Sequence, residues 1–154
     1  MASREEVFGA LFDRVALCSW GDPARLKTFK TKSRRVKLFS DVDAKQQPAC
    51  FQAEHNETSA QKSNLPYKRI WEAQWIIYHA VGDPKAVPAI ENNLIIEAVE
   101  AALAPLPSDP GFLDQRNTLN GLVYHCYIDG TIFKDPGDID NQGMIVVPIK
   151  LLVP

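Results

Sequence analysis

The sequence predicts a single α+β domain, in which an antiparallel or mixed sheet of about five strands carries two helices on one face. Two segments repeat apolar residues at helical spacing, and five others have the composition or alternation of strands. The links between the strands are short or contain a helix. With 154 residues, 45% of them hydrophobic, the chain can form one core, and no repeat or linker divides residues 1–154.

The first helix is expected to begin after Ser3 and to end near Leu17. Ser3 and Glu6 have the spacing of a capping box, in which each side chain bonds a free amide of the first helical turn. Apolar residues then recur on one face, namely Val7, Phe8, Leu11, Phe12 and Val15. A Gly and a Pro within residues 19–23 end the helix.

The next segments predict two strands separated by polar chain. Residues 26–39 favour an exposed or edge strand, but their alternation is broken, which predicts a bulge or bend near residues 31–33. Residues 41–48 form a polar connection with room for one helical turn. Residues 49–54 form a short strand, and residues 55–66 are polar enough to predict a mobile loop or hairpin tip.

The second half of the chain gives the clearest patterns. Residues 67–80 give the clearest strand, with Trp71, Ala73, Trp75 and Ile77 on one face and Lys68, Glu72 and Gln74 on the other. A helix is expected over residues 89–104, with the apolar stripe Ile90, Leu94, Ile95, Ala98 and Leu103, followed by a proline-rich loop to residue 117. Strands over residues 118–133 and 143–153 then pair around a turn at residues 135–138, which gives the order α-β-β-β-α-β-β.

A run of cations between residues 25 and 37 is the most unusual feature of the composition. It contains no acid and comprises Arg25, Lys27, Lys30, Lys32, Arg34, Arg35 and Lys37. Such a run can protect an exposed sheet edge from unwanted pairing, or it can contact phosphates or an acidic neighbouring subunit. The net charge is −2, so the rest of the chain is acidic, and this separation suits head-to-tail packing in a ring. The pI near 5.9 argues against a general nucleic-acid-binding protein.

No set of residues in the sequence predicts a catalytic, cofactor-binding or metal-binding site. The three cysteines, Cys18, Cys50 and Cys126, are widely spaced and are expected to be buried free thiols. His125 and Cys126 are neighbours in a predicted strand, so they point to opposite faces and cannot form a nucleophile pair. His55 and His79 belong to no ligand spacing.

Other chemical motifs are absent from the sequence as well. The acidic segment of residues 135–143 does not complete a calcium loop, because the twelfth position counted from Asp138 is the apolar Ile149. No phosphate-binding glycine motif occurs. The N-terminus lacks a signal peptide, and no stretch has the roughly 20 apolar residues that cross a bilayer. We therefore expect a non-enzymatic protein without cofactors that is made in a cytoplasm and makes no membrane contact.

Several segments together resemble one family. They are residues 3–12, 29–31, 33–35, 40–42, 47–49, 90–105, 118–126 and 146–149. The chain resembles, over almost its whole length, the tail-terminator or minor tail-completion proteins of siphophages and related prophages. These segments are typical of the family rather than catalytic signatures.

The resemblance implies a structural protein of the virion tail or neck, without catalytic residues. Such proteins form a homo-hexameric ring on the last ring of the tail tube, where they contact the major tail-tube protein and stop its polymerisation. They present their other surface to the head-tail connector protein, and DNA passes through the pore without sequence-specific binding.

In that setting, residues 25–37 are expected to lie at a subunit interface or to line the pore. Residues 55–66 and 105–117 are the candidate contacts with tube or connector. Three other functions stay open: a head-tail connector or stopper ring, a small cytoplasmic enzyme, and a nucleic-acid-binding module that uses the basic strand.

Overall fold

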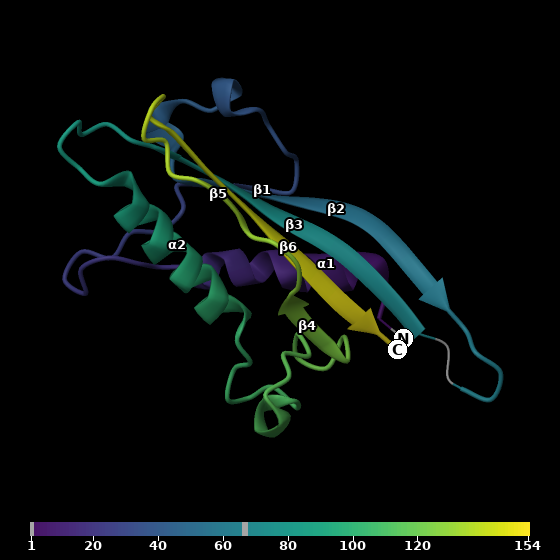
Figure 1. The fold of residues 1–154 in the computed structure, drawn as a ribbon. Helices are drawn as coiled ribbons and strands as arrows, with labels where there is room; N and C mark the ends of the chain where they lie inside the picture. The colour runs from purple at the N-terminus through teal and green to yellow at the C-terminus, as the bar shows by residue number, and fades with distance from the viewer. Residues whose placement is uncertain (1, 66–67) are drawn as a thin grey trace.

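A mixed sheet with two helices on one face organises the protein (Figure 1). The computed structural model describes residues 2–65 and 68–154. Along the described chain the elements are α1 (Arg4–Asp13), β1 (Thr31–Ser33), β2 (Ala49–Ala60), β3 (Lys68–Ala80), α2 (Pro88–Leu103), β4 (His125–Ile128), β5 (Phe133–Asp135) and β6 (Gln142–Val153). The predicted α+β class and mixed sheet are confirmed, although three described strands follow α2 instead of the expected two.

The sheet is built around β3, which has 13 residues and lies between β2 and β6, each of 12 residues. The strand order is β1-β2-β3-β6-β4, and β5 also pairs with β6. Every pairing is antiparallel except that of β1 with β2. The antiparallel pairing of β5 with β6 around the turn after Asp135 confirms the hairpin predicted there.

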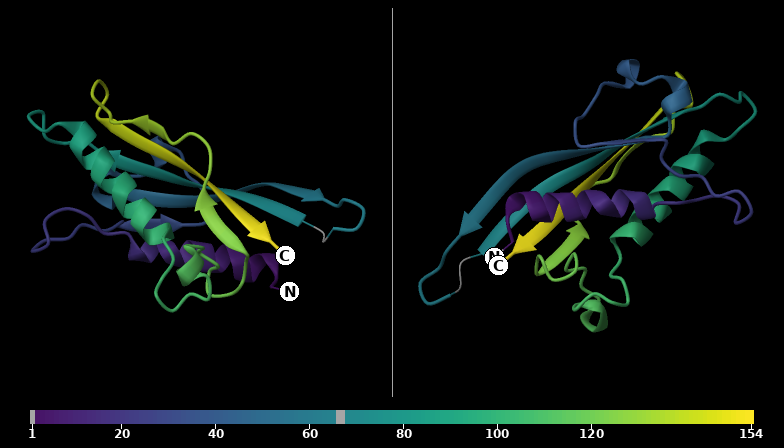
Figure 2. Two further views of the ribbon diagram at one scale, coloured as in Figure 1. Left: turned by 60° about the horizontal axis from the view of Figure 1, so that its bottom comes forward. Right: turned by 180° about the vertical axis from the view of Figure 1, so that it is seen from behind.

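The main core lies between this sheet and both helices, which cover the same face (Figure 2). The alternating residues of β3 that the sequence placed on one face, from Trp71 to Ile77, are all buried there. They pack with the inward residues of β6 and with Val7, Phe8 and Leu11 of α1. The alternation of side chains along β3 therefore puts these residues on one face, as predicted, and that face is the one that forms the core. On the opposite face, a smaller apolar cluster forms around Phe51 and Tyr78.

Both helices begin and end close to the predicted residues. The capping box is formed: the Ser3 hydroxyl accepts from the Glu6 amide at 3.1 Å, and the Glu6 carboxylate accepts from the Ser3 amide at 2.7 Å. A 3-10 turn, Arg14–Leu17, continues α1 to the predicted end. In α2 the predicted apolar stripe is wrong at Ile90, which is 59% exposed.

The predicted strand over residues 26–39 is wrong except at Thr31–Ser33, where a bulge or bend was expected. These three residues pair with Ala49–Phe51 at the edge of the sheet, so the edge position is confirmed. The flanking residues belong to no strand in the described part of the chain, apart from one isolated bridge between Lys27 and Trp20, and short 3-10 turns follow at Phe39–Asp41 and Ala44–Gln46.

The segment of residues 55–66, predicted as a mobile loop or hairpin tip, is strand as far as Ala60, so the prediction is wrong for residues 55–60, while residues 61–65 lie at the tip of the hairpin. β2 continues to Ala60 and pairs with β3, with one irregularity between Glu54 and Glu57. Figure 1 shows this hairpin projecting past the end of β6. Residues 54–60 are all exposed, so their polar side chains are tolerated in a strand. Pro66 and the first residue of the predicted strand over residues 67–80 lie outside the described residues.

The strand predicted over residues 118–133 is also largely wrong. Only His125–Ile128 and Phe133–Asp135 are strands. Leu119, Asn120 and Gly121 have positive φ angles, which no strand accommodates. Their segment instead wraps around the buried carboxylate of Asp109.

Candidate functional site

The basic segment of residues 25–37 lies outside the core and is held to it at a few points. Trp20 and Lys27 form an isolated antiparallel bridge, and the ring of Trp20 lies 5.0 Å from the buried ring of Phe29. The Lys30 amide donates to the Pro48 carbonyl oxygen at 2.8 Å. The segment is therefore held at a few points, of which only Thr31–Ser33 lie along the sheet edge, while most of its side chains face solvent.

Two of the seven cations are neutralised within the chain. Lys27 Nζ lies 3.3 Å from Glu91 Oε2, and the same carboxylate accepts from Trp20 Nε1 at 2.8 Å. Arg34 bonds both Glu5 and Glu54, and these contacts raise the pKa of its guanidinium. Arg34 therefore ties β1 to α1 and β2.

The remaining five cations, Arg25, Lys30, Lys32, Arg35 and Lys37, are exposed and form no ion pair with any described residue. Three large apolar side chains stand among them: Leu26 is 57% exposed, Val36 42% and Leu38 69%. A basic segment that only protects a sheet edge from pairing gains nothing from exposed leucine side chains. Protein contact surfaces, in contrast, combine apolar side chains with charged ones.

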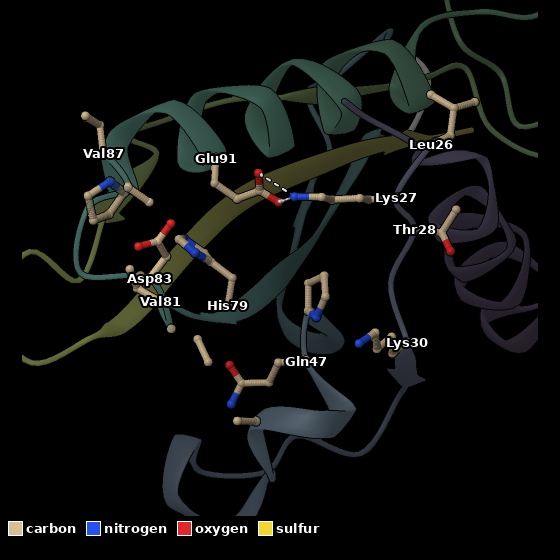
Figure 3. A pocket seen from close by; sticks show the side chains of 16 residues that line it. Leu26, Lys27, Thr28, Lys30, Gln47, His79, Val81, Asp83, Val87 and Glu91 are labelled. Atoms are coloured by element: carbon tan, nitrogen blue, oxygen red, sulfur yellow. Dashed lines mark hydrogen bonds and ion pairs between the residues drawn. The ribbon is translucent and has the colours of Figure 1, made fainter. Parts of the chain in front are cut away.

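A pocket of about 600 Å³ opens beside this segment (Figure 3). Its walls come from four separate parts of the chain: residues 26–30, residues 44–48, the end of β3 with residues 81–83, and the start of α2. Figure 3 shows Gln47 and Lys30 across the pocket from Glu91 and Val87. The site is thus assembled by the tertiary fold, and no local motif marks it.

His79 forms the buried part of the pocket wall. It is 3% exposed, and its Nε2 lies 3.2 Å from Asn92 Oδ1 on α2. Burial lowers the pKa of His79, so the neutral imidazole is favoured. Its ring lies over Gly143, the residue opposite in β6, where an added Cβ would come within 2.2 Å of the ring. Gly143 therefore provides the space that His79 occupies.

Gln47 is the unusual polar group of the pocket. Its side chain is buried, and its Nε2 donates to the Val42 carbonyl oxygen at 3.1 Å. Its Oε1 accepts no hydrogen bond from any described residue. A buried acceptor without a donor costs about 1–3 kcal/mol, and because Oε1 itself is shielded from solvent, this cost lies within the wall of the pocket.

The second predicted contact loop, residues 105–117, is firmly anchored. The carboxylate of Asp109 accepts from Thr118 Oγ1 at 2.6 Å and from the amides of Gly111 and Thr118 at 2.8 and 3.0 Å. The buried Arg14 donates to the carbonyl oxygens of Ala102 and Ala104 at the end of α2, where it supplies a cation that the helix's own last turn lacks. The loop presents Leu113, 94% exposed, on this fixed base.

The three cysteines are buried free thiols, as predicted. Burial raises the pKa of Cys18 and of Cys126 to about 12, which disfavours the nucleophilic thiolate. His125 and Cys126 lie on opposite faces of β4, and His125 Nδ1 accepts from the Asn117 amide at 3.2 Å. Among the described residues, no three His, Cys, Asp or Glu side chains gather as a metal site, and no helix is long and apolar enough to cross a membrane.

The sequence identified the basic segment but not the pocket beside it. Gln47 lay in a segment expected to be a polar connection, and His79 at the end of a strand, and neither position carries a signal of its own. Comparison of the chain with known protein families found no match, and comparison with curated proteins found no similar sequence.

Proposed function

We propose that the protein is a structural subunit that forms a homo-hexameric ring on the tail tube of a long-tailed phage. The ring ends polymerisation of the major tail-tube protein and joins the tail to the head-tail connector protein, and DNA passes through its pore. The observation that carries this proposal is the basic segment, in which five cations form no ion pair with described residues and in which Leu26 and Val36, with the adjoining Leu38, expose apolar side chains.

A protein contact explains this segment better than protection of the edge alone. Unpaired like charges repel one another, and exposed Leu26 and Leu38 lose the free energy that burial gives, about 25 cal/mol per Å² of apolar surface. Contact with an acidic, partly apolar surface removes both costs. The mixture of the two side-chain types favours a subunit interface over a pore lining, which needs charge alone.

The same chain offers an acidic partner surface. The rest of the molecule carries a net charge of −9 once the seven cations of the basic segment are set apart. On the solvent side of α2, Glu97 and Glu100 are exposed and form no ion pair with described residues. Unlike surfaces on one chain suit a head-to-tail interface, which closes into a ring when the rotation between copies permits.

Two projecting features are proposed to meet the other tail proteins. The hairpin of β2 and β3 projects beyond β6, and Arg4 holds Glu57 near its base at 2.9 Å (Figure 1). The anchored loop of residues 105–117 presents Leu113 at a different end of the molecule. Both are suited to contacts with tube or connector because they are exposed and their bases are fixed.

The test is a polymerisation assay with the purified tail-tube protein of the same phage. Addition of this protein is expected to give short tubes with a ring at one end in electron micrographs. Arg35→Glu is expected to abolish the ring, because Arg35 is exposed and makes no intramolecular ion pair. Arg34→Glu is a poorer choice, since it also breaks the contacts with Glu5 and Glu54.

Lys134→Glu on β5 is the matched control, because it makes the same charge change at another exposed position. It should cap tubes as the unchanged protein does. If the unchanged protein neither binds tube ends nor shortens the tubes, the proposed function is wrong. If Arg35→Glu caps tubes normally, the assigned interface is wrong.

A further inference from the structure

The exposed face of α2 carries acids and no cation. The helix contains three glutamates but no lysine or arginine along its 16 residues. Its exposed side chains recur at helical spacing and form one stripe, which comprises Ile90, Asn93, Glu97, Glu100 and Ala101 and continues to Ala104 at the C-cap. A helix face that only meets water ordinarily mixes charges of both signs, so this stripe is suited to a basic partner.

Two of the glutamates are left unpaired by their own chain. Lys27 neutralises Glu91 at the start of the helix, but Glu97 and Glu100 form no ion pair or hydrogen bond with any described residue. Glu100 lies in the last turn, where the helix dipole disfavours an anion. The buried Arg14 donates there to backbone carbonyl oxygens and to neither glutamate. A cation from outside the chain would therefore stabilise both carboxylates.

Unpaired cations of the basic segment lie against the other face of the sheet. Arg35 and Lys37 are exposed and form no ion pair with described residues. The Lys37 carbonyl oxygen accepts from the Tyr78 hydroxyl at 2.7 Å, and Tyr78 belongs to the apolar cluster opposite the helices. The stripe of α2 is on the helix-bearing side (Figure 2). One copy therefore cannot join its own two surfaces, whereas the corresponding surfaces of two copies can meet.

The spacing of the charges on the two surfaces is similar. Arg35 and Lys37 are two residues apart, so their Cα atoms are at most about 7 Å apart. Glu97 and Glu100 are three residues apart on a helix, which puts their Cβ atoms about 5–6 Å from each other. The two flexible cationic side chains can therefore reach both carboxylates in one contact.

We propose that residues 35–38 of one copy dock on the exposed stripe of α2 of the next copy. The two cations of this segment pair with Glu97 and Glu100, and Leu38 packs over the alanines of the stripe, whose small side chains allow a close approach. The contact joins unlike surfaces, so it leaves one of each free at the ends of an open assembly and closes into a ring when the rotation between copies permits. The inference rests on the proposed function, for which it names the partner surface of the basic segment.

The test places a photoreactive benzophenone amino acid at position 38 of the full chain, where Leu38 is 69% exposed. The protein is irradiated alone and together with the tail-tube protein. Covalent dimers are expected, with attachment points in residues 90–104. The same amino acid at position 139 is the control, because Ile139 is 99% exposed but belongs to the turn between β5 and β6. It should give no attachment to α2.

Charge exchange tests the chemistry of the contact. Glu97→Lys together with Glu100→Lys is expected to lower the dimer yield from position 38 by about tenfold or more, because like charges then face each other. Adding Arg35→Glu and Lys37→Glu to the same chain is expected to restore the yield. Recovery distinguishes a direct contact from a loss of folding, since a misfolded chain would not be rescued by two further substitutions.

Asp138→Lys together with Asp140→Lys is the matched control, because it makes the same charge change at two other exposed acids. It should leave the dimer yield from position 38 unchanged.

Each outcome decides between the two proposals. Absence of attachment to α2 in both samples, or charge exchange without recovery, overturns this inference. Normal capping of tubes together with absent attachment to α2 leaves the ring function in place and rejects only this interface. Attachment to α2 without any capping of tubes supports the interface and rejects the tail function.

Discussion

Replacing Gly143 by alanine tests how tightly the pocket wall is packed. The added Cβ would lie 2.2 Å from His79 Cε1, 2.4 Å from Nε2 and 2.5 Å from Nδ1. Ordinary contacts between carbon atoms are about 3.5–4.0 Å, so the ring must retreat by at least about 1.3 Å. Such a shift breaks the 3.2 Å contact between His79 and Asn92 beneath α2.

Three contributions set the expected change in the free energy of unfolding of Gly143→Ala. Overpacking costs about 1–3 kcal/mol, and loss of the buried hydrogen bond costs about 1 kcal/mol. Alanine in a strand regains about 0.5–1 kcal/mol relative to glycine. Gly143→Ala is therefore expected to lower the free energy of unfolding by about 1–3 kcal/mol, measured by urea denaturation with circular dichroism.

A double-mutant cycle with His79→Ala isolates the cause. Without the imidazole ring the added methyl group has space, so Gly143→Ala should become neutral or slightly stabilising in that background. Gly9→Ala is the control, because nothing lies within 4 Å of the new Cβ and the helix should gain about 0.5–1 kcal/mol. Equal losses from Gly143→Ala in both backgrounds, within about 0.5 kcal/mol, would refute the assignment of His79 as the group that meets the methyl.

Three further predictions concern the rest of the fold. Ser3→Ala should lower the free energy of unfolding by about 1 kcal/mol, because it removes half of the capping box; an unchanged urea midpoint would contradict this. Asp109→Ala should cost about 3–5 kcal/mol, because the buried amides of Gly111 and Thr118 lose their acceptor. Burial opposes ionisation of Asp109, but hydrogen bonds led by that from Thr118 outweigh it and lower its pKa. The Asp109 carboxylate therefore contributes its full stabilisation above the pKa of an unfolded aspartate, about 3.9, and this contribution is lost as the pH falls through the lower pKa of the folded protein. The Asp109→Ala variant should not show this loss of stability in an acid titration. The thiols of Cys18 and Cys126, whose pKa burial raises to about 12, should react with a thiol reagent only after unfolding; rapid labelling of the native protein would contradict their burial.

The sequence predicted the elements that local signals determine. The capping box predicted the start of α1, and alternation of apolar residues identified β3 and β6, because each signal lies within the element it describes. Alternation of large apolar residues along β3 also identified the core, since those side chains need burial wherever their strand pairs.

The errors lie where a distant partner decides the structure. Residues 26–39 have strand-like composition but find a neighbouring strand only at Thr31–Ser33, and residues 54–60 are polar yet pair because β3 lies beside them. Residues 118–124 were predicted as the start of a strand, but the amides of Thr118 and Asn120 donate to the carboxylate of Asp109 and the segment forms turns instead. The pocket escaped prediction for the same reason, since Gln47 and His79 meet only in the folded chain.

Electron microscopy of particles from a phage that lacks this gene tests the central claim most directly. If the protein ends tail polymerisation as proposed, the tails should be overlong or irregular and detached from heads, because nothing then stops polymerisation of the tube. Tails of normal length beside heads that cannot join them would contradict length termination and place the protein on the connector side. Intact, infectious particles would contradict any role in the virion.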